Sequence, residues 1–202
     1  MVRGRAIDTA GLIAAAAGVF ERKGFRNSTI DDVAEAAGIA RATLYRYTDS
    51  KQHMLDMIVD VILDDMAVGL RAALRSEGSP RERLRRYVEA HARLFLDNRI
   101  FYGIVFTEER EMSDRGRQAF RTWARSVTDD FTRLVEEYGS STGSAAAVDA
   151  AFASNAVLSM LSMLYRWYRP GGAVGESELA DHLFLLVDGA LTGVTQPLPS
   201  GR

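Results

Sequence analysis

The fold of this chain is decided by the stretch NSTIDDVAEAAGIARATLYRYTDSK, which runs from Asn27 to Lys51. It predicts two short helices joined by a tight Gly-Ile turn. Thr29 stands where an N-cap hydroxyl can accept a backbone N–H of the first helix. Gly38 follows the last apolar residue of that helix, where a left-handed backbone favours glycine, and Ile39 can pack between the two helices. This is the pattern of a helix-turn-helix.

The second helix of the pair is expected from Ala40 to Tyr47. Leu44 is the residue expected on its buried side. The residues expected to project outward combine a cation, a hydroxyl and aromatic rings: Arg41, Ala42, Thr43, Tyr45 and Tyr47. Such a set suits contacts with base edges and phosphates.

At these residues the chain resembles the tetracycline-repressor (TetR) family of transcriptional regulators. The resemblance rests on the run Gly-Ile-x-x-x-x-Leu-Tyr-x-aromatic-x-x-Ser-Lys between Gly38 and Lys51. It extends back through an amphipathic helix expected at residues 7–23, ended by Gly24 and anchored by Phe25. A DNA-binding domain at residues 1–50 is therefore expected.

The resemblance also implies roles for single residues. Arg41, Thr43, Tyr45 and Tyr47 would face the major groove, and Thr29 and Lys51 would contact phosphates. Two positions depart from the family pattern. Thr48 stands where a phenylalanine usually packs between the helices, and Asp49 stands where a neutral or basic residue is common beside the DNA backbone. Looser packing and a weaker phosphate affinity are the expected effects.

Composition excludes several classes of protein. The 202 residues are 47% hydrophobic and include no cysteine, so the chain can bury a core but has no disulfide, thiolate nucleophile or cysteine zinc site. Its three histidines, His53, His91 and His182, are too scattered to predict a metal site. No cofactor is expected. A membrane span is not expected either, because no run of eighteen uninterrupted apolar residues occurs. A cytoplasmic protein is the expectation.

The sequence beyond residue 50 predicts helices alone. They are expected at residues 51–74, from Pro80 onward, and at 100–111, 114–138, 144–169 and 176–194, with a Gly/Ser loop at 139–143. The predicted fold class is all-α. It combines a three-helix helix-turn-helix domain with a helical ligand-binding and dimerisation domain at residues 51–202.

The last two predicted helices are apolar on two sides. On the first of them, one stripe holds Phe152, Ala156, Met160, Met163 and Trp167, and another holds Val157, Leu161, Leu164 and Tyr168. A helix of this kind needs two partners. We therefore expect a homodimer through these helices, reading a palindromic DNA operator with half-sites roughly 34 to 36 Å apart.

Aromatic and methionine side chains of the larger domain suit an apolar ligand pocket, and equally a plain helical core. The candidates for ligand binding are Phe101, Tyr102, Phe106, Trp123, Met163, Arg166, Trp167 and Arg169.

The segment from Leu164 to Leu191 resembles the C-terminal signature of a TetR subgroup that responds to acyl-CoA thioesters. The run Tyr-Arg-Trp-Tyr-Arg-Pro-Gly-Gly at residues 165–172 carries this resemblance. Arg166 and Arg169 would bind phosphates of the coenzyme. Alternatively, these arginines stabilise the end of a helix through its dipole.

Together these observations predict a repressor released from its operator by an acyl-CoA ester or a related lipid or steroid catabolite. One alternative is a repressor of an efflux gene that senses hydrophobic drugs. An enzyme is not expected, since no nucleophile–base pair, phosphate loop or metal ligand set occurs. A helical interaction module that never touches DNA is the remaining alternative.

Overall fold

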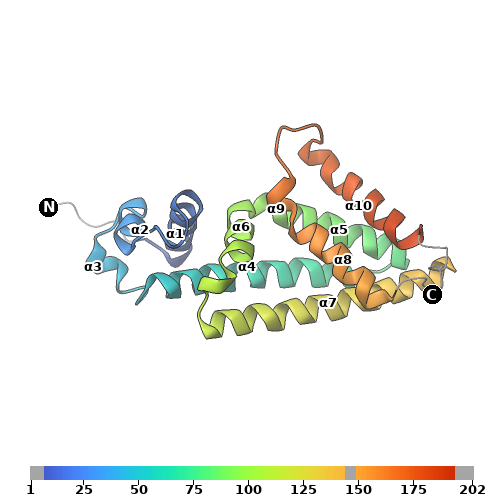
Figure 1. The fold of residues 1–202 in the computed structure, drawn as a ribbon, viewed down its shortest axis with the longest axis horizontal. Helices are drawn as coiled ribbons and strands as arrows, with labels where there is room; N and C mark the ends of the chain where they lie inside the picture. Colours follow the sequence, from blue (N-terminus) through green and yellow to red (C-terminus); the bar gives the residue numbers. More distant parts are fainter. Residues whose placement is uncertain (1–6, 144–148, 194–202) are drawn as a thin grey trace, which may run out of the picture. The chain divides into compact units, whose positions relative to one another are not determined.

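The computed structural model describes residues 7–143 and 149–193, and within these ranges all regular structure is helical. The helices pack into two compact units. Unit 1 comprises residues up to Asp64 together with Asn98–Arg121, and unit 2 comprises Asp65–Asp97 together with the residues from Thr122 onward. Helices α4 (Lys51–Leu74) and α7 (Asp114–Thr142) each contribute to both units (Figure 1). The functional boundary expected after residue 50 stays a prediction.

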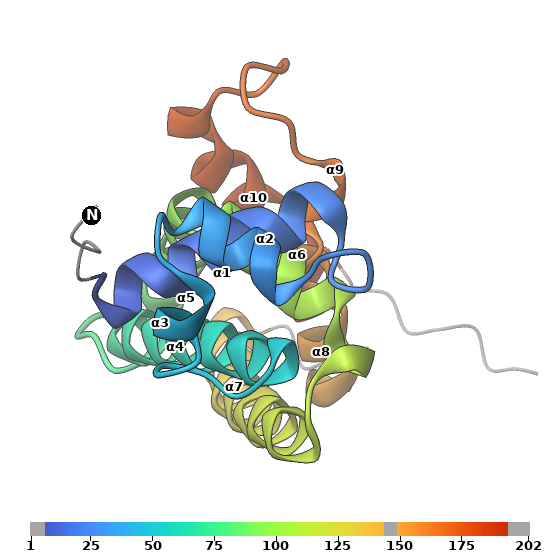
Figure 2. The same cartoon turned by 90° about the vertical axis from the view of Figure 1, so that its left-hand side faces the viewer.

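Unit 1 begins with three helices, α1 (Thr9–Lys23), α2 (Ile30–Ala36) and α3 (Arg41–Leu44). In Figure 2, α1 and α2 lie against each other. The predicted cap of α2 is present: the Thr29 hydroxyl accepts from the Asp32 amide at 3.1 Å, and the Asp32 carboxylate accepts from the Thr29 amide at 2.8 Å. This reciprocal pair satisfies two amides that the helix end would leave open.

The turn between α2 and α3 has the predicted glycine geometry. Gly38 has a φ of 66°, in the left-handed region. Its amide donates to the Glu35 carbonyl, and the Ile39 amide donates to the Ala34 carbonyl, each at 3.0 Å. This is a Schellman ending, which brings Ile39 back over the helix, and Ile39 is buried as predicted.

Helix α3 is shorter than the predicted Ala40–Tyr47. It ends at Leu44, and the next residues form a tighter turn in which the Arg46 amide donates to Thr43 and the Tyr47 amide to Leu44. Thr48 is buried, and its hydroxyl donates to the Ser50 carbonyl at 2.9 Å. Because the threonine hydroxyl is satisfied within the turn, the chain can bury this residue where a phenylalanine is usual.

The rest of unit 1 comes from α6 (Arg99–Thr107), the 3-10 helix η1 (Glu109–Glu111) and the start of α7. Helix α6 packs against α1. The predicted helix at 100–111 is thus interrupted at Glu108, after which the chain continues as a single 3-10 turn.

A polar clip fastens α4 to the beginning of α7. The buried Asp56 carboxylate accepts from the Ser113 hydroxyl at 2.5 Å and from the Ser113 amide at 3.2 Å. Gly116 lies so close that a Cβ at this position would clash with Asp56 Oδ1. The first turn of α7 therefore receives a negative charge where the helix dipole favours one.

Unit 2 is a helical bundle of α5 (Pro80–Asp97), α8 (Ala150–Ser162), α9 (Leu164–Trp167) and α10 (Glu176–Thr192) with the second parts of α4 and α7. Helix α10 lies along α5 (Figure 1). The Arg81 guanidinium of α5 donates two hydrogen bonds, of 3.1 and 2.8 Å, to the Asp188 carboxylate of α10. The Tyr138 hydroxyl donates to the same carboxylate at 2.6 Å.

Two helix ends in unit 2 differ from the predictions. Helix α7 continues to Thr142 through the expected loop, and the hydroxyls of Ser140, Ser141 and Thr142 donate to carbonyls one turn earlier. The helix expected at 144–169 is divided at Met163 into α8 and α9. Beyond the division, Tyr168 is buried against Phe95 of α5, with the ring centres 6.0 Å apart. The expected helix ends at residues 144 and 194 lie outside the described residues.

None of the helices described is both long enough and apolar enough to cross a membrane.

Candidate nucleic-acid interface and ligand site

The exposed face of α3 is the candidate nucleic-acid interface. Leu44 is fully buried and fixes the rotation of the helix, which leaves Arg41, Ala42 and Tyr45 exposed. Thr43 is half-buried. Four of the five residues predicted to project outward therefore lie at or near the surface of this short helix.

Arg41 forms hydrogen bonds with two neighbouring side chains. Its guanidinium donates to Asp31 at 2.7 Å and to the Tyr45 hydroxyl at 3.2 Å. The bond with Tyr45 and the charge of Asp31 raise the pKa of Arg41, so the side chain stays cationic. Since both partners of the Arg41–Asp31 pair are more than half exposed, the pair contributes little energy, and a phosphate or a base can replace the carboxylate.

Thr29 is exposed at the N-terminus of α2. Its oxygen accepts from Asp32, which leaves the hydroxyl proton available as a donor. The predicted contact between Thr29 and a phosphate is compatible with this geometry and stays a prediction.

Tyr47 and Lys51 make contacts within unit 1 instead. The Tyr47 hydroxyl donates to the Ile7 carbonyl at 2.8 Å. The Lys51 ammonium donates to the carbonyls of Phe25, Ser28 and Arg26 at 2.5, 2.8 and 3.3 Å, and lies 4.4 Å from the centre of the Phe25 ring. With three acceptors around its three protons, Lys51 ties the start of α4 to the loop between α1 and α2. The roles predicted for both residues on DNA stay predictions that this geometry does not favour.

Arg46 is an exposed cation that the prediction of site residues omitted. It follows Tyr45 in the turn after α3 and has an exposed side chain. In the sequence, the only indication of this role was that Arg46 is a cation next to residues predicted to project outward.

The ligand-binding candidates are distributed over both units. Phe101, Tyr102 and Phe106 belong to α6 in unit 1, where the rings of Tyr102 and Phe106 lie 5.8 Å apart and Phe106 meets Phe120 edge-on. Tyr102 is fully buried, which fits the interpretation of this group as core. The other candidates, Trp123, Met163, Arg166, Trp167 and Arg169, belong to unit 2.

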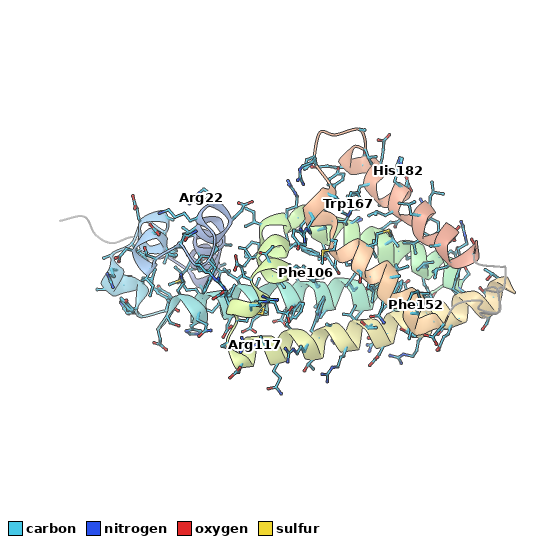
Figure 3. The ribbon with its side chains drawn as sticks, viewed as in Figure 1. Arg22, Phe106, Arg117, Phe152, Trp167 and His182 are labelled. Carbon is cyan, nitrogen blue, oxygen red and sulfur yellow. The ribbon has the colours of Figure 1, made fainter. Side chains whose placement is uncertain are left out.

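Met163 and Trp167 lie on the outer surface of unit 2. They share one apolar stripe of α8 and α9 with Phe152, whose side chain is 69% exposed, and Trp167 is 51% exposed (Figure 3). The second stripe is buried, as shown by Val157, Leu161, Leu164 and Tyr168. The two sides predicted for this helix thus have different environments in the single chain.

Arg166 and Arg169 occupy the end of α9. Arg169 donates to the carbonyls of Arg166 and Tyr168, both at 3.2 Å, and both arginines are exposed. This arrangement fits the helix-end interpretation of Arg169, and the phosphate-binding role stays a prediction.

The buried hydroxyls without hydrogen-bond partners in unit 2 were not predicted from the sequence. Tyr87 of α5 and Ser154 of α8 are fully buried, and within the described residues no hydrogen-bond partner reaches the Tyr87 hydroxyl or the Ser154 hydroxyl. One turn after Tyr87 lies His91, which donates to the Leu161 carbonyl and whose pKa is lowered by burial to about 4. Apolar periodicity predicts which residues are buried, but it does not predict whether their polar atoms find hydrogen-bond partners.

Comparison with known proteins identifies the family. Residues 12–58 match the family described as bacterial regulatory proteins, tetR family, and residues 77–191 match the family described as tetracyclin repressor-like, C-terminal domain. The second match alone covers more than half of the chain. This chain belongs to the TetR family of transcriptional regulators. The predicted all-α fold, with an N-terminal helix-turn-helix domain and a helical C-terminal domain, is confirmed.

Relatives within the TetR family include repressors. The chain is 30% identical over 183 residues to the HTH-type transcriptional repressor KstR2 of Rhodococcus jostii, a match that covers 88% of each protein. These TetR relatives are regulators of transcription rather than enzymes.

Two solved structures share the fold at lower identity. The ketosteroid transcriptional regulator KstR2 of Mycobacterium tuberculosis superposes with a TM-score of 0.81 at 23% identity, covering 95% of this chain and 99% of that one. AibR, solved in complex with isovaleryl coenzyme A and operator DNA, superposes with a TM-score of 0.76 at 19% identity, covering 88% and 96%.

Proposed function

We propose that this TetR regulator is a dimeric repressor that reads operator DNA with α3 and is released by an apolar, oxygen-bearing effector, in the first place an acyl-CoA ester or steroid catabolite. The observation that carries the DNA-binding part is the exposed set Arg41, Ala42 and Tyr45 around the buried Leu44. A guanidinium can bind guanine in a bidentate manner, and methyl and aromatic groups can contact thymine.

The DNA-binding part is tested by fluorescence anisotropy on the DNA upstream of the gene. Arg41→Ala and Tyr45→Ala should each weaken specific binding by roughly 1 to 3 kcal/mol, whereas Arg22→Ala, which removes an exposed cation of α1, should change it little. Arg46→Ala should weaken specific and nonspecific DNA alike and flatten the salt dependence, as expected for a phosphate contact. Equal loss in all four variants would contradict a reading role for α3.

The dimeric part rests on exposed apolar side chains of the last helices. Phe152, Trp167, Leu185 and Leu186 are each more than half exposed in the single chain. Helix α10 also carries a buried set on another face, formed by Leu179, Leu183, Phe184 and Val187. An exposed apolar group of this size is typical of an interface between protein chains.

The interface is tested by oligomeric state. Leu186→Arg should give a monomer in analytical ultracentrifugation and lose tight operator binding, because a palindromic operator needs two readers. Val68→Arg replaces an even more exposed apolar side chain, on α4, and should leave the dimer intact. A dimeric Leu186→Arg, together with a dimeric Phe152→Arg, would exclude this surface.

The effector part rests on the buried hydroxyls of Tyr87 and Ser154. A buried hydroxyl without a partner is costly, so a polar atom of a ligand in the interior of unit 2 would gain a hydrogen bond there. A carbonyl or carboxyl oxygen on an otherwise apolar molecule fits this requirement. The relatives support the same class, since one is named a ketosteroid regulator and another is bound to isovaleryl coenzyme A.

The effector is tested by adding acyl-CoA esters, steroid acids and hydrophobic drugs to the operator complex. Release by an ester or acid should be weakened about tenfold or more in Tyr87→Phe and Ser154→Ala, which remove only hydroxyls, while operator binding without effector stays unchanged. Release by apolar drugs alone, with no effect of either variant, would favour control of an efflux gene.

A further inference from the structure

A pocket lined mainly by arginines lies in unit 2. It has a volume of about 170 Å³ and is formed by side chains of α4, α5 and α7: Arg71, Leu74, Arg75, Arg83, Asp130, Arg133 and Glu137. Sites for whole drug-sized ligands measure roughly 300–1,000 Å³, whereas a water molecule occupies about 30 Å³. The arginine pocket therefore has room for one ionic group rather than for a whole effector.

The arginine pocket carries an excess of positive charge. Four arginines and two acidic residues line it. Arg83 pairs with Glu137 at 2.5 Å, and Arg133 pairs with Asp130. Within the described residues, Arg71 and Arg75 have no carboxylate partner. Two positive charges thus remain uncompensated around one small hollow.

Arg83 is fixed in position before any ligand binds. Its Nε donates to the Leu74 carbonyl at 2.9 Å, and its side chain is only 22% exposed. Arg71 and Arg75 lie at the end of α4, where the helix dipole also favours cations. That preference accounts for exposed cations at a helix end, but not for arginines of three helices that line one pocket.

A larger hollow adjoins the arginine pocket. It is a shallow, open depression of the surface, is lined by Pro80, Glu136, Ser140 and Ser141, and shares Arg133 and Glu137 with the arginine pocket. The remainder of a molecule whose charged group sits among the arginines has space there.

We propose that the arginine pocket binds a phosphate group, either of inorganic phosphate or of a small phosphate ester. The planar donor fork of arginine matches phosphate oxygens in a bidentate manner, which makes phosphate a better fit than a single carboxylate oxygen. This site goes beyond the proposed function, because it requires neither the operator nor the apolar effector. It also places a small-molecule site on the last turn of α4, the helix whose first turn is tied down by Lys51.

The test is isothermal titration calorimetry of the full chain at low, fixed ionic strength. The probes are adenosine 3′,5′-bisphosphate and inorganic phosphate, with adenosine as the uncharged control. The double variant Arg71→Ala/Arg75→Ala should lower the affinity for a phosphate probe at least tenfold. The matched control Arg93→Ala/Arg99→Ala removes two exposed arginines outside the pocket and should change it less than twofold.

Each result bears on the proposal. Binding of the bisphosphate alone supports a phosphate ester, and binding of both probes with the same dependence on Arg71 and Arg75 supports free phosphate. If neither probe binds, or if the two double variants lose affinity equally, the site is overturned. Matching thermal unfolding curves of both double variants exclude a folding defect, and calorimetry without DNA separates this result from any failure in operator binding.

Discussion

Unit 1 places its polar side chains at helix ends, where Thr29, Asp56 and Lys51 meet specific amides and carbonyls. Unit 2, in contrast, keeps polar groups of Tyr87, His91 and Ser154 inside a mainly apolar bundle. The first arrangement fixes backbone directions. The second leaves hydrogen-bonding capacity in the interior.

This contrast fits the two tasks of the proposed function, DNA reading and effector binding. A DNA reader must hold a short helix in one orientation, and four residues of α3 cannot do so by their own stability. Caps and ties supply that orientation. A ligand-binding bundle can hold its shape by burial of apolar surface, so it can retain polar groups for another molecule. Changes to the polar groups of one unit at a time can therefore test this contrast.

Acid should weaken unit 2 through His91. Burial lowers the pKa of His91 to about 4 from an ordinary 6.5. The unfolded chain therefore takes up the proton first, and the stabilisation is complete above pH 6.5 and is lost as the pH falls toward 4. We expect a loss of about 3 kcal/mol over this range. Urea unfolding followed by tryptophan fluorescence reports on it, because both tryptophans lie in unit 2.

The control for this prediction is His91→Gln, which should unfold with little dependence on pH in the same range. If His91→Gln keeps the wild-type pH dependence, another group causes the effect.

In unit 1, hydrogen bonds from Lys23 and Thr29 lower the pKa of Asp32 to about 2. Its contribution is present above pH 4 and is lost only as the pH falls through 2. Amide NMR signals of α2 should hence remain unchanged between pH 6.5 and 4.

Lys51→Met should destabilise unit 1 by roughly 2 to 3 kcal/mol, because three carbonyls lose a charged donor. Lys51→Arg keeps the charge and should recover part of the loss. Hydrogen exchange of the α2 amides measures the stability, and operator binding against salt concentration measures phosphate contacts. A reduced salt slope with unchanged exchange would restore the predicted phosphate role and weaken the contrast between the units.

Gly116→Ala should destabilise the clip by about 2 kcal/mol. The new Cβ would clash with Asp56 Oδ1, and the bonds from Ser113 prevent that carboxylate from moving away. Gly103→Ala in α6 is the matched control, since its Cβ would meet no described atom within 4 Å apart from its chain neighbours and the nearby backbone of α6, and it should stabilise by up to about 1 kcal/mol. Thermal unfolding measures both. Equal shifts would show that the contact around Asp56 is loose.

Thr29→Ala should cost about 1 kcal/mol through loss of the cap on α2. Thr29→Ser keeps the capping oxygen and serves as the control. Circular dichroism melting gives the stability, and operator anisotropy gives the DNA affinity. An affinity loss that Thr29→Ser fully restores, without a change in melting, would assign the hydroxyl to DNA rather than to the helix end.

The sequence was sufficient for features of unit 1 that depend on near neighbours. The cap at Thr29, the left-handed Gly38 and the buried Leu44 each follow from residues within a few positions. The partners of Tyr47 and Lys51 lie far back in the chain, at Ile7 and Phe25, and local periodicity contains no information about them. For this reason Tyr47 and Lys51, which were both predicted to contact DNA, form contacts within unit 1 in the structure.

In unit 2 the apolar periodicity predicted the stripes but not their use. Val157 and Phe152 belong to equally apolar stripes, yet one is buried and the other exposed. Hydrophobicity does not distinguish a core from an interface or a ligand wall. The loop predicted after Tyr138 was also wrong, because serine hydroxyls can bond back to the helix as well as leave it.

The contacts around Glu111 and Ser113 limit how far the DNA reader can be transplanted. Arg26 donates to the Glu111 carboxylate at 2.7 Å, Gln52 donates to the Glu111 carbonyl at 3.0 Å, and Asp56 holds Ser113. A chimeric regulator that receives only the first fifty-odd residues would inherit these side chains without their partners. A transfer of the DNA-binding region to another regulator should therefore include two segments of the chain. The second is the segment around Glu111 and Ser113.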